Sequence, residues 1–209
     1  DNLQADDIFQ LSSVSKMFTA EAVMILKNEG KIDYDVDIRE YIPEFPYEGV
    51  TTRLLLNHRS GLPRYESLAD AKWPDRKKPF FNEDMIEYYA KYQPTPYFKP
   101  NGGFNYSNVN YALLASVIER VSGMSFADYM RVKIFEPIGM DNSYIYEMNP
   151  DTNVSLYIED VVQGYYMDRR RPMQAPNEYL NGVKGDKMMM SNTEDMFKFM
   201  TAVDYGLLL

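Results

Sequence analysis

The sequence of 209 residues has no cysteine and only one histidine, His58. The absence of cysteine excludes a thiol nucleophile, a disulfide and a cysteine-ligated zinc site. With one histidine and no H-E-x-x-H motif, we expect no metal site and no other cofactor. No apolar run approaches the roughly 18 residues that a membrane-spanning helix needs, and no signal peptide is recognisable.

Positive charge is also scarce. The chain has 22 Lys and Arg against 31 Asp and Glu, which gives a formal net charge of −9. Because phosphate binding depends on basic side chains, we expect no nucleic-acid partner. The one basic cluster, Arg169 to Arg171, lies between Asp168 and Pro172 and is typical of a solvated loop.

Helical patterns dominate what is present. Residues 14–26 are almost all apolar, and residues 109–121 have apolar positions at helical spacing with Gly123 just beyond. Asn82 is predicted to cap a helix over 83–92, and Ser125 to cap one through about 135. Capping-box spacing from Ser191 predicts a final helix. The helices that we predict cover residues 14–26, 52–57, 83–92, 109–121, 125–135 and 192–204.

Strand patterns are few. The best candidates are residues 154–158 and 161–166, and residues 141–186 otherwise read as an irregular segment over the surface. No internal repeat or low-complexity linker divides the chain. We therefore expect one mainly helical unit.

Ser13 and Lys16 form the only S-x-x-K motif. Three residues are close to one helical turn, so the hydroxyl and the amine share a face. A serine needs a neighbouring base, and a lysine in an apolar helix is desolvated, which disfavours its charged form. About one such motif is expected by chance in a chain of this length. The alternative is that Ser12 or Ser13 only caps the helix while Lys16 snorkels to water.

A second constellation is Tyr106-Ser107-Asn108, which follows a Pro-Asn-Gly-Gly turn and precedes the strongest helix. At such a junction the phenol and the amide can point into one cleft. The phenol suits proton transfer, and the amide can donate to a substrate carbonyl. The alternative is that Tyr106 only packs and Asn108 only caps the helix.

These motifs, in this order, resemble the serine β-lactamase family that includes class C β-lactamases, low-molecular-weight penicillin-binding proteins and related esterases. The similarity spans nearly the whole chain. It is carried by Phe9–Lys16, Leu54–Leu62 ("LL-x-H-x-SGL"), Phe104–Asn108, Phe135–Met140 and Ser191–Phe199 ("ST-x-ED").

The resemblance implies an α+β, β-lactamase/transpeptidase-like fold, of which residues 1–209 are mainly the helical part, with most of the antiparallel sheet missing. The expected divisions are a nucleophile helix at about 13–29, a helical subdomain at about 50–140, an irregular wrap at about 141–190 and a C-terminal helix at about 192–204.

The resemblance also implies a two-step acyl transfer. Ser13 would attack a carbonyl, and its backbone N–H would be one oxyanion donor. Lys16 would be the base or a proton relay, and Tyr106 would move protons to and from the leaving group and water. Asn108 would hold the substrate's side chain. Whether Lys16 or Tyr106 is the base stays open.

Two features depart from the family. The third motif, a Lys- or His-led tripeptide ending in Gly on an edge strand, does not occur downstream of Tyr106. Residues Gly185–Met190 also have less glycine than the family usually has. Without a G-x-S-x-G elbow, a serine–histidine triad is not indicated, and the turn motif around His58 predicts a structural hydrogen bond.

The sequence thus predicts a serine acyl-transfer hydrolase acting on small-molecule or peptidyl substrates: β-lactams, D-Ala-D-Ala-like amides or esters. The alternative is a catalytically silent binding or sensing module with the same fold. For these residues alone we expect little or no turnover. We also expect an exposed flank on the helix at 14–26, which a partner chain or segments outside this sequence would cover. The resemblance suggests a periplasmic, extracellular or membrane-associated bacterial enzyme.

Overall fold

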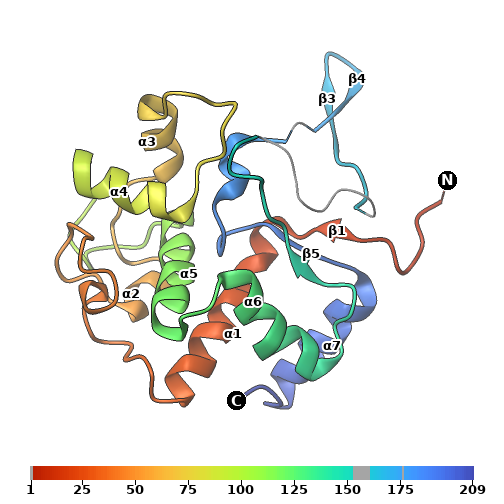
Figure 1. The fold of residues 1–209 in the computed structure, drawn as a ribbon, viewed down its shortest axis with the longest axis horizontal. Coiled ribbons are helices and arrows are strands. Elements are labelled where there is room, and N and C mark those ends of the chain that lie inside the picture. Colours follow the sequence, from red (N-terminus) through yellow and green to blue (C-terminus); the bar gives the residue numbers. More distant parts are fainter. Residues whose placement is uncertain (1, 153–160, 176) are drawn as a thin grey trace.

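The computed structural model describes residues 2–152, 161–175 and 177–209, and it is rich in helix (Figure 1). The helices are α1 (Ser15–Asn28), α2 (Thr52–Leu56), α3 (Tyr65–Lys72), α4 (Asn82–Tyr92), α5 (Asn108–Ser122), α6 (Phe126–Met130) and α7 (Thr193–Asp204). The strands are β1 (Phe9–Gln10), β2 (Tyr144–Ile145), β3 (Tyr165–Asp168), β4 (Arg171–Gln174) and β5 (Met189–Ser191). The predicted α+β fold with most of its sheet missing is confirmed.

The helix α5 lies at the centre of the core. Its residues from Val109 to Ile118 are all buried, and it contacts α1, α2, α4 and α6. An apolar helix that is covered on every side belongs inside a protein, which explains why its sequence carries so little charge. Gly123 ends it in the left-handed conformation, with φ of 71°.

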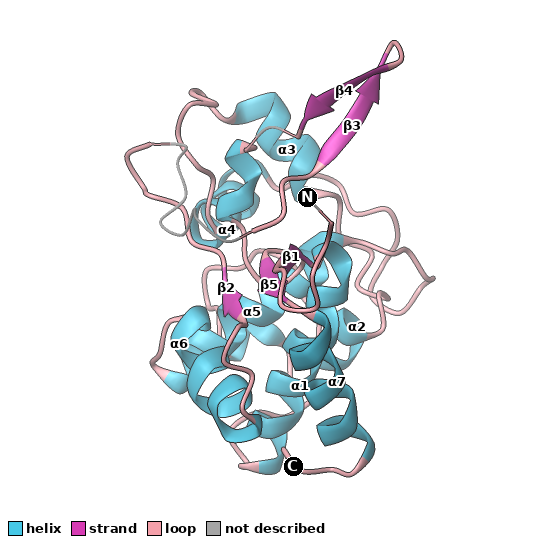
Figure 2. Cartoon of the chain, turned by 90° about the vertical axis from the view of Figure 1, so that its right-hand side faces the viewer, coloured by secondary structure: helices cyan, strands magenta, loops and turns pink. Residues whose placement is uncertain are grey.

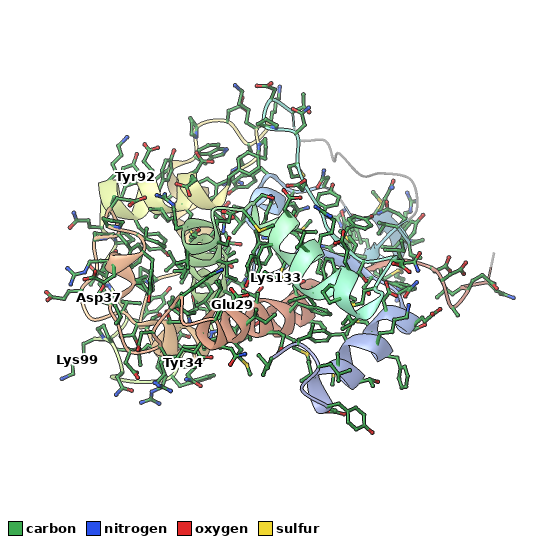
Figure 3. All side chains as sticks on the ribbon, turned by 60° about the horizontal axis from the view of Figure 1, so that its bottom comes forward. Glu29, Tyr34, Asp37, Tyr92, Lys99 and Lys133 are labelled. Atoms are coloured by element: carbon green, nitrogen blue, oxygen red, sulfur yellow. The ribbon has the colours of Figure 1, made fainter. Side chains whose placement is uncertain are left out.

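The helix α1 runs beside α7, and aromatic packing holds the two together (Figure 2). The rings of Phe18 and Phe199 are stacked with centroids 3.7 Å apart, and both side chains are buried. Beyond the end of α1, Glu29 forms an ion pair with Lys133 at 2.7 Å, which ties α1 to the turn after α6 (Figure 3).

A small sheet positions the start of α1. Strand β5 lies between β1 and β2 and is antiparallel to both, with Phe9 opposite Ser191 and Ile145 opposite Met189. These strands have two or three residues each, too few to show the alternation that predicts a strand from sequence.

The second strand pair is a hairpin, β3–β4, that projects from the body of the molecule (Figures 1 and 2). Arg169 and Arg170 form its turn with φ of 43° and 71°, the positive values that a two-residue hairpin turn requires. The three arginines are exposed, as predicted for a solvated loop.

Several predictions of local structure need correction. Asn82 does not cap α4 from outside but is its first residue, and its side-chain amide donates to the carbonyl oxygens of Ala112 and Lys184. The helix α3 was not predicted from the sequence. The strand predicted at 161–166 begins only at Tyr165, and the one predicted at 154–158 lies outside the described residues.

The outer side of α1 is apolar and exposed, as predicted. Met17 and Met24 of α1, and Val14 just before it, are between 38% and 43% exposed, and Phe197 and Met200 of the neighbouring α7 are also exposed. Within the described ranges, no helix is long and apolar enough to cross a bilayer.

Candidate active site

Ser13 lies at the entrance of α1, where the chain leaves the small sheet. Ser12 takes a left-handed φ of 48°, and Ser12–Val14 form a single 3-10 turn that leads into the helix. The cap positions are Leu11 for this turn and Val14 for α1, so neither serine occupies one. The alternative that these serines only cap the helix is therefore wrong. Ser13 is exposed, so its hydroxyl is accessible to a ligand.

Lys16 lies one turn along the helix and points inward. It is only 6% exposed, and its Nζ donates to Ser13 Oγ at 3.2 Å and to the backbone oxygen of Asp186 at 2.6 Å. The alternative that Lys16 snorkels to water is therefore wrong. Its Nζ is instead fixed between the serine and a carbonyl from a distant part of the chain.

Tyr106 approaches the same serine from the loop before α5. Its hydroxyl donates to Ser13 Oγ at 2.9 Å, and Lys16 Nζ lies 5.1 Å from the centre of its ring. The side chain is 50% exposed. The structure thus brings Ser13, Lys16 and Tyr106 into one hydrogen-bonded cluster at the surface.

Asn108 is the first residue of α5, and Ser107 occupies the cap position before it. The amide nitrogen of Asn108 donates to Glu66 Oε1 at 2.8 Å, which links it to the first turn of α3. Its carbonyl oxygen is buried, and no partner for it occurs in the part of the chain that the structure describes. Asn108 therefore lies beside the cluster without contributing to the bonds at Ser13.

Asp186 is the residue that the sequence did not reveal as part of this site. Its backbone oxygen accepts from Lys16, and its carboxylate is fully buried and accepts from Tyr65 Oη at 2.9 Å. Burial raises the pKa of the Asp186 carboxyl, while the ammonium groups of Lys187 and Lys16 oppose that shift. The one local signal was an acidic residue between Gly185 and Lys187, just before a run of methionines.

Comparison with known proteins gives this constellation its context. The family model described as Beta-lactamase matches residues 2–209. The chain belongs to the β-lactamase family. It is 38% identical to penicillin-binding protein 4* of Bacillus subtilis over 94% of this chain and 45% of that protein.

Two solved structures of similar proteins have the same fold as this chain. A penicillin-binding protein from Bacillus halodurans superposes with a TM-score of 0.83 at 27% identity, over 99% of this chain and 62% of that one. A D-amino acid amidase from Ochrobactrum anthropi, complexed with L-phenylalanine amide, gives a TM-score of 0.80 at 26% identity, over 99% and 58%. The chain spans about half the length of the curated relatives it matches.

In this β-lactamase-family chain, His58 supports the tyrosine. Its Nδ1 accepts from the backbone N–H of Ser107 at 3.3 Å and lies 3.0 Å from the amide nitrogen of Asn110. Its ring lies 4.4 Å from that of Tyr106, centre to centre. Burial lowers the pKa of His58, with a smaller effect from the charge of Lys16. His58 thus makes structural hydrogen bonds, as predicted.

The described residues contain no group of three acidic or histidine side chains that could hold a metal ion. The cluster itself offers a hydroxyl, an amine and a phenol. A serine hydroxyl becomes a strong nucleophile only when a neighbouring base accepts its proton, and Lys16 and Tyr106 are the side chains bonded to this one.

Proposed function

We propose that this protein is a serine acyl-transfer hydrolase in which Ser13 forms a covalent acyl-enzyme. The observation that carries the proposal is the pair of hydrogen bonds at Ser13 Oγ, from Lys16 Nζ at 3.2 Å and from Tyr106 Oη at 2.9 Å. A serine hydroxyl is a weak nucleophile until such a neighbour takes its proton.

In the first step, Ser13 Oγ attacks the substrate carbonyl and its proton passes to the neutral amine of Lys16 or to the phenolate of Tyr106, the forms of these groups that can accept a proton. The backbone N–H of Ser13 stabilises the oxyanion. Tyr106 then protonates the leaving group, because its hydroxyl is bonded to Ser13 Oγ and its side chain is half-exposed. In the second step, water gives up a proton to the same groups as its oxygen attacks the acyl carbonyl. The bond to Ser13 Oγ then breaks, and the proton passes to Oγ, which restores the serine hydroxyl.

Asn108 positions the substrate in this proposal. Glu66 holds the amide nitrogen, which fixes the orientation of the side chain. The carbonyl oxygen is buried and has no partner among the described residues, so its surroundings must open before it accepts from an N–H of the substrate. This differs in direction from the sequence-based expectation, in which the amide nitrogen donates to a substrate carbonyl.

The substrates that we propose are β-lactams, D-Ala-D-Ala-like amides or esters. Penicillin-binding protein and amidase are the names of similar proteins. We further propose that the protein acts in the periplasm, outside the cell or at the membrane surface.

The chain does not contain the family's Lys- or His-led third motif, which supplies a second oxyanion donor. Loss of one such donor costs about 100- to 1,000-fold in rate. We therefore propose that residues 1–209 alone have little or no turnover, and that the full-length protein supplies this donor.

The same missing motif favours a second candidate, a catalytically silent binding or sensing module. A module of this kind would bind the same ligands and would not be acylated at Ser13. The two candidates differ in whether a covalent adduct forms.

The test is covalent labelling of the full-length protein with a fluorophosphonate and with a fluorescent penicillin. We expect labelling by at least one probe, and its loss in Ser13→Ala. The matched control is Ser67→Ala, which removes an exposed helical serine on α3 and should label normally. Labelling that persists in Ser13→Ala would refute the nucleophile, and no labelling of the wild-type protein would support the silent module.

A further inference from the structure

The loop that carries Tyr106 is bonded to His58 on both sides of that tyrosine. The backbone oxygen of His58 accepts from the N–H of Asn105 at 2.9 Å, and its ring nitrogen Nδ1 accepts from the N–H of Ser107 at 3.3 Å. The imidazole ring also packs on the ring of Tyr106, with centroids 4.4 Å apart. One residue that is only 9% exposed therefore holds Tyr106 through both chain neighbours and through its ring.

Buried hydrogen bonds determine which nitrogen of this ring carries the proton. A backbone N–H can only donate, so Nδ1, which accepts from Ser107, carries no proton. The amide nitrogen of Asn110 lies 3.0 Å from the same atom, and the oxygen of that amide accepts from Ser60 Oγ, which directs the amide nitrogen to the ring. Ser60 and Asn110 are both buried. His58 is therefore neutral, with its proton on Nε2.

The backbone of His58, just after α2, is in the left-handed region with φ of 54°. Few residues with a side chain adopt this region, and asparagine is among those that do so most readily. The oxygen of an asparagine side chain is also a hydrogen-bond acceptor. Asparagine is thus the substitution that keeps both the backbone conformation and an acceptor on the Nδ1 side of the ring.

The surroundings of His58 keep its ring unprotonated. Burial lowers the pKa of His58 below 6.5, and the positive charge of Lys16 on α1 lowers it further. The other titratable groups at the ring are the phenols of Tyr106 and of Tyr111 on α5, whose ring centre lies 5.2 Å away. A proton that bound to this ring would go to Nδ1 and would remove the acceptor for Ser107.

We propose that His58 is a positioning residue that holds the hydroxyl of Tyr106 on Ser13 through the unprotonated Nδ1 of its ring. The inference rests on the proposed acyl transfer at Ser13 and adds to it a residue that does not touch the nucleophile. The side chain of Tyr106 is half-exposed, so the bonds to its loop decide where its hydroxyl lies. A displacement of about 1 Å can lower a rate about 100-fold.

The first test separates the acceptor from the ring in the full-length protein. His58→Phe keeps an aromatic ring beside Tyr106 and removes Nδ1, whereas His58→Asn removes the ring and keeps an acceptor. For His58→Phe we expect the rate constant of acylation by a fluorescent penicillin to fall about 10- to 100-fold, with a smaller change in the probe concentration that gives half the maximal rate. His58→Asn should recover most of the lost rate. Equal rate constants for the two variants, or a wild-type rate constant for His58→Phe, overturn the proposal.

A double substitution distinguishes the positioning of Tyr106 from damage to the fold. In the Tyr106→Phe background, His58→Phe should slow acylation by less than about threefold, because the hydroxyl that His58 positions is already gone. A general loss of structure would slow acylation by the same factor in both backgrounds. That result contradicts the proposal.

The pH dependence tests the same claim in proteins that both keep an acceptor at neutral pH. The wild-type protein loses the acceptor as the pH falls through the native pKa of His58, which lies below 6.5, whereas His58→Asn does not titrate. We expect the ratio of the wild-type rate constant to that of His58→Asn to fall with pH, since the titrations of Lys16 and Tyr106 are common to both proteins. A constant ratio between neutral pH and about pH 4.5 contradicts the proposal.

Hydrogen exchange tests the contact itself and needs no turnover. Fragment-resolved mass spectrometry should show the backbone amide of Ser107 exchanging about tenfold faster in His58→Phe than in His58→Asn, the effect of losing one hydrogen bond. Equal exchange rates contradict the role of Nδ1. A wild-type protein that no probe acylates contradicts acyl transfer at Ser13 and leaves the bond to Ser107 to be decided by these exchange rates.

Discussion

The two sides of α1 differ in what surrounds them. On the inner side, Lys16 and Thr19 are buried and donate to a strained loop, and Phe18 stacks on α7. On the outer side, Met17 and Met24 are apolar and exposed. The inner side thus forms a rigid half-site from residues far apart in sequence, whereas the outer side has the composition of a buried surface without a cover. We expect parts of the full-length protein beyond these residues to cover it.

The largest difference should be in the acylation rate, between a substitution of Lys16 on the inner side and one of Lys27 on the outer side. Lys16→Met removes the amine from Ser13 and should lower the acylation rate about 1,000-fold, within the range for general acid–base groups. Lys27→Met changes an exposed lysine of the same helix, and its rate should stay within about twofold, because surface ion pairs contribute little. Stopped-flow acylation by a fluorescent penicillin measures both. Equal acylation rates for the two variants would contradict the claim that only the inner side of α1 takes part in the reaction.

Substitutions on the two sides of α1 should also differ in how much they lower the free energy of unfolding. Phe18→Ala removes a fully buried ring and should lower the free energy of unfolding by about 3–5 kcal/mol. Met24→Ala, on the exposed side, should change it by less than about 0.5 kcal/mol in residues 1–209. Urea unfolding followed by circular dichroism gives both values. A cost above about 2 kcal/mol for Met24→Ala in the full-length protein only would show that its outer side is covered there.

Tyr106→Phe should have an intermediate effect, because it removes one proton-transfer group and leaves the ring on His58 in place. We expect kcat to fall about 100-fold with little change in stability. Tyr205→Phe, at an exposed residue after α7, is the control and should behave like the wild type. If Tyr106→Phe acylates normally but deacylates slowly, Lys16 is the base of the first step.

The smallest effect concerns pH. Burial holds the pKa of His58 below its ordinary value of 6.5, so the unfolded chain binds a proton at higher pH than the native one does. The contribution of His58 to stability is therefore complete above about pH 6.5 and is lost as pH falls through the lower native pKa. Between pH 7.5 and 5, the melting temperature should fall less for His58→Gln than for the wild type. An equal fall in melting temperature for the two proteins would mean that His58 has the same pKa in the native and the unfolded chain.

Much of the helical framework could be predicted from the sequence because its signals are local. The apolar face of α5, the glycine after it and the polar residues before α6 and α7 mark those helices within a few residues. The helix α3 was not predicted because its sequence signals are weak. Only Tyr65, Leu68 and Ala69 of its residues are buried, and its cap residue, Arg64, makes no side-chain capping bond.

Some residues of the site could likewise be found from local sequence patterns, and others could not. Ser13 and Lys16 are one helical turn apart, and Tyr106 lies in a motif of its own, so their pattern is visible along the chain. Asp186 and Lys187 reach Lys16 and Tyr65 from more than 100 residues away, and only the fold brings them there. Tertiary contacts of this kind leave no periodic trace in a single sequence.

The position of the acyl group on the protein tests the account most directly. After brief reaction of the full-length protein with a penicillin or an activated ester and acid quenching, tandem mass spectrometry of the peptide around residues 9–16 separates Ser12, Ser13 and Ser15. The account predicts one acyl group, on Ser13. An adduct on Ser12, on Ser15 or on another peptide would contradict it.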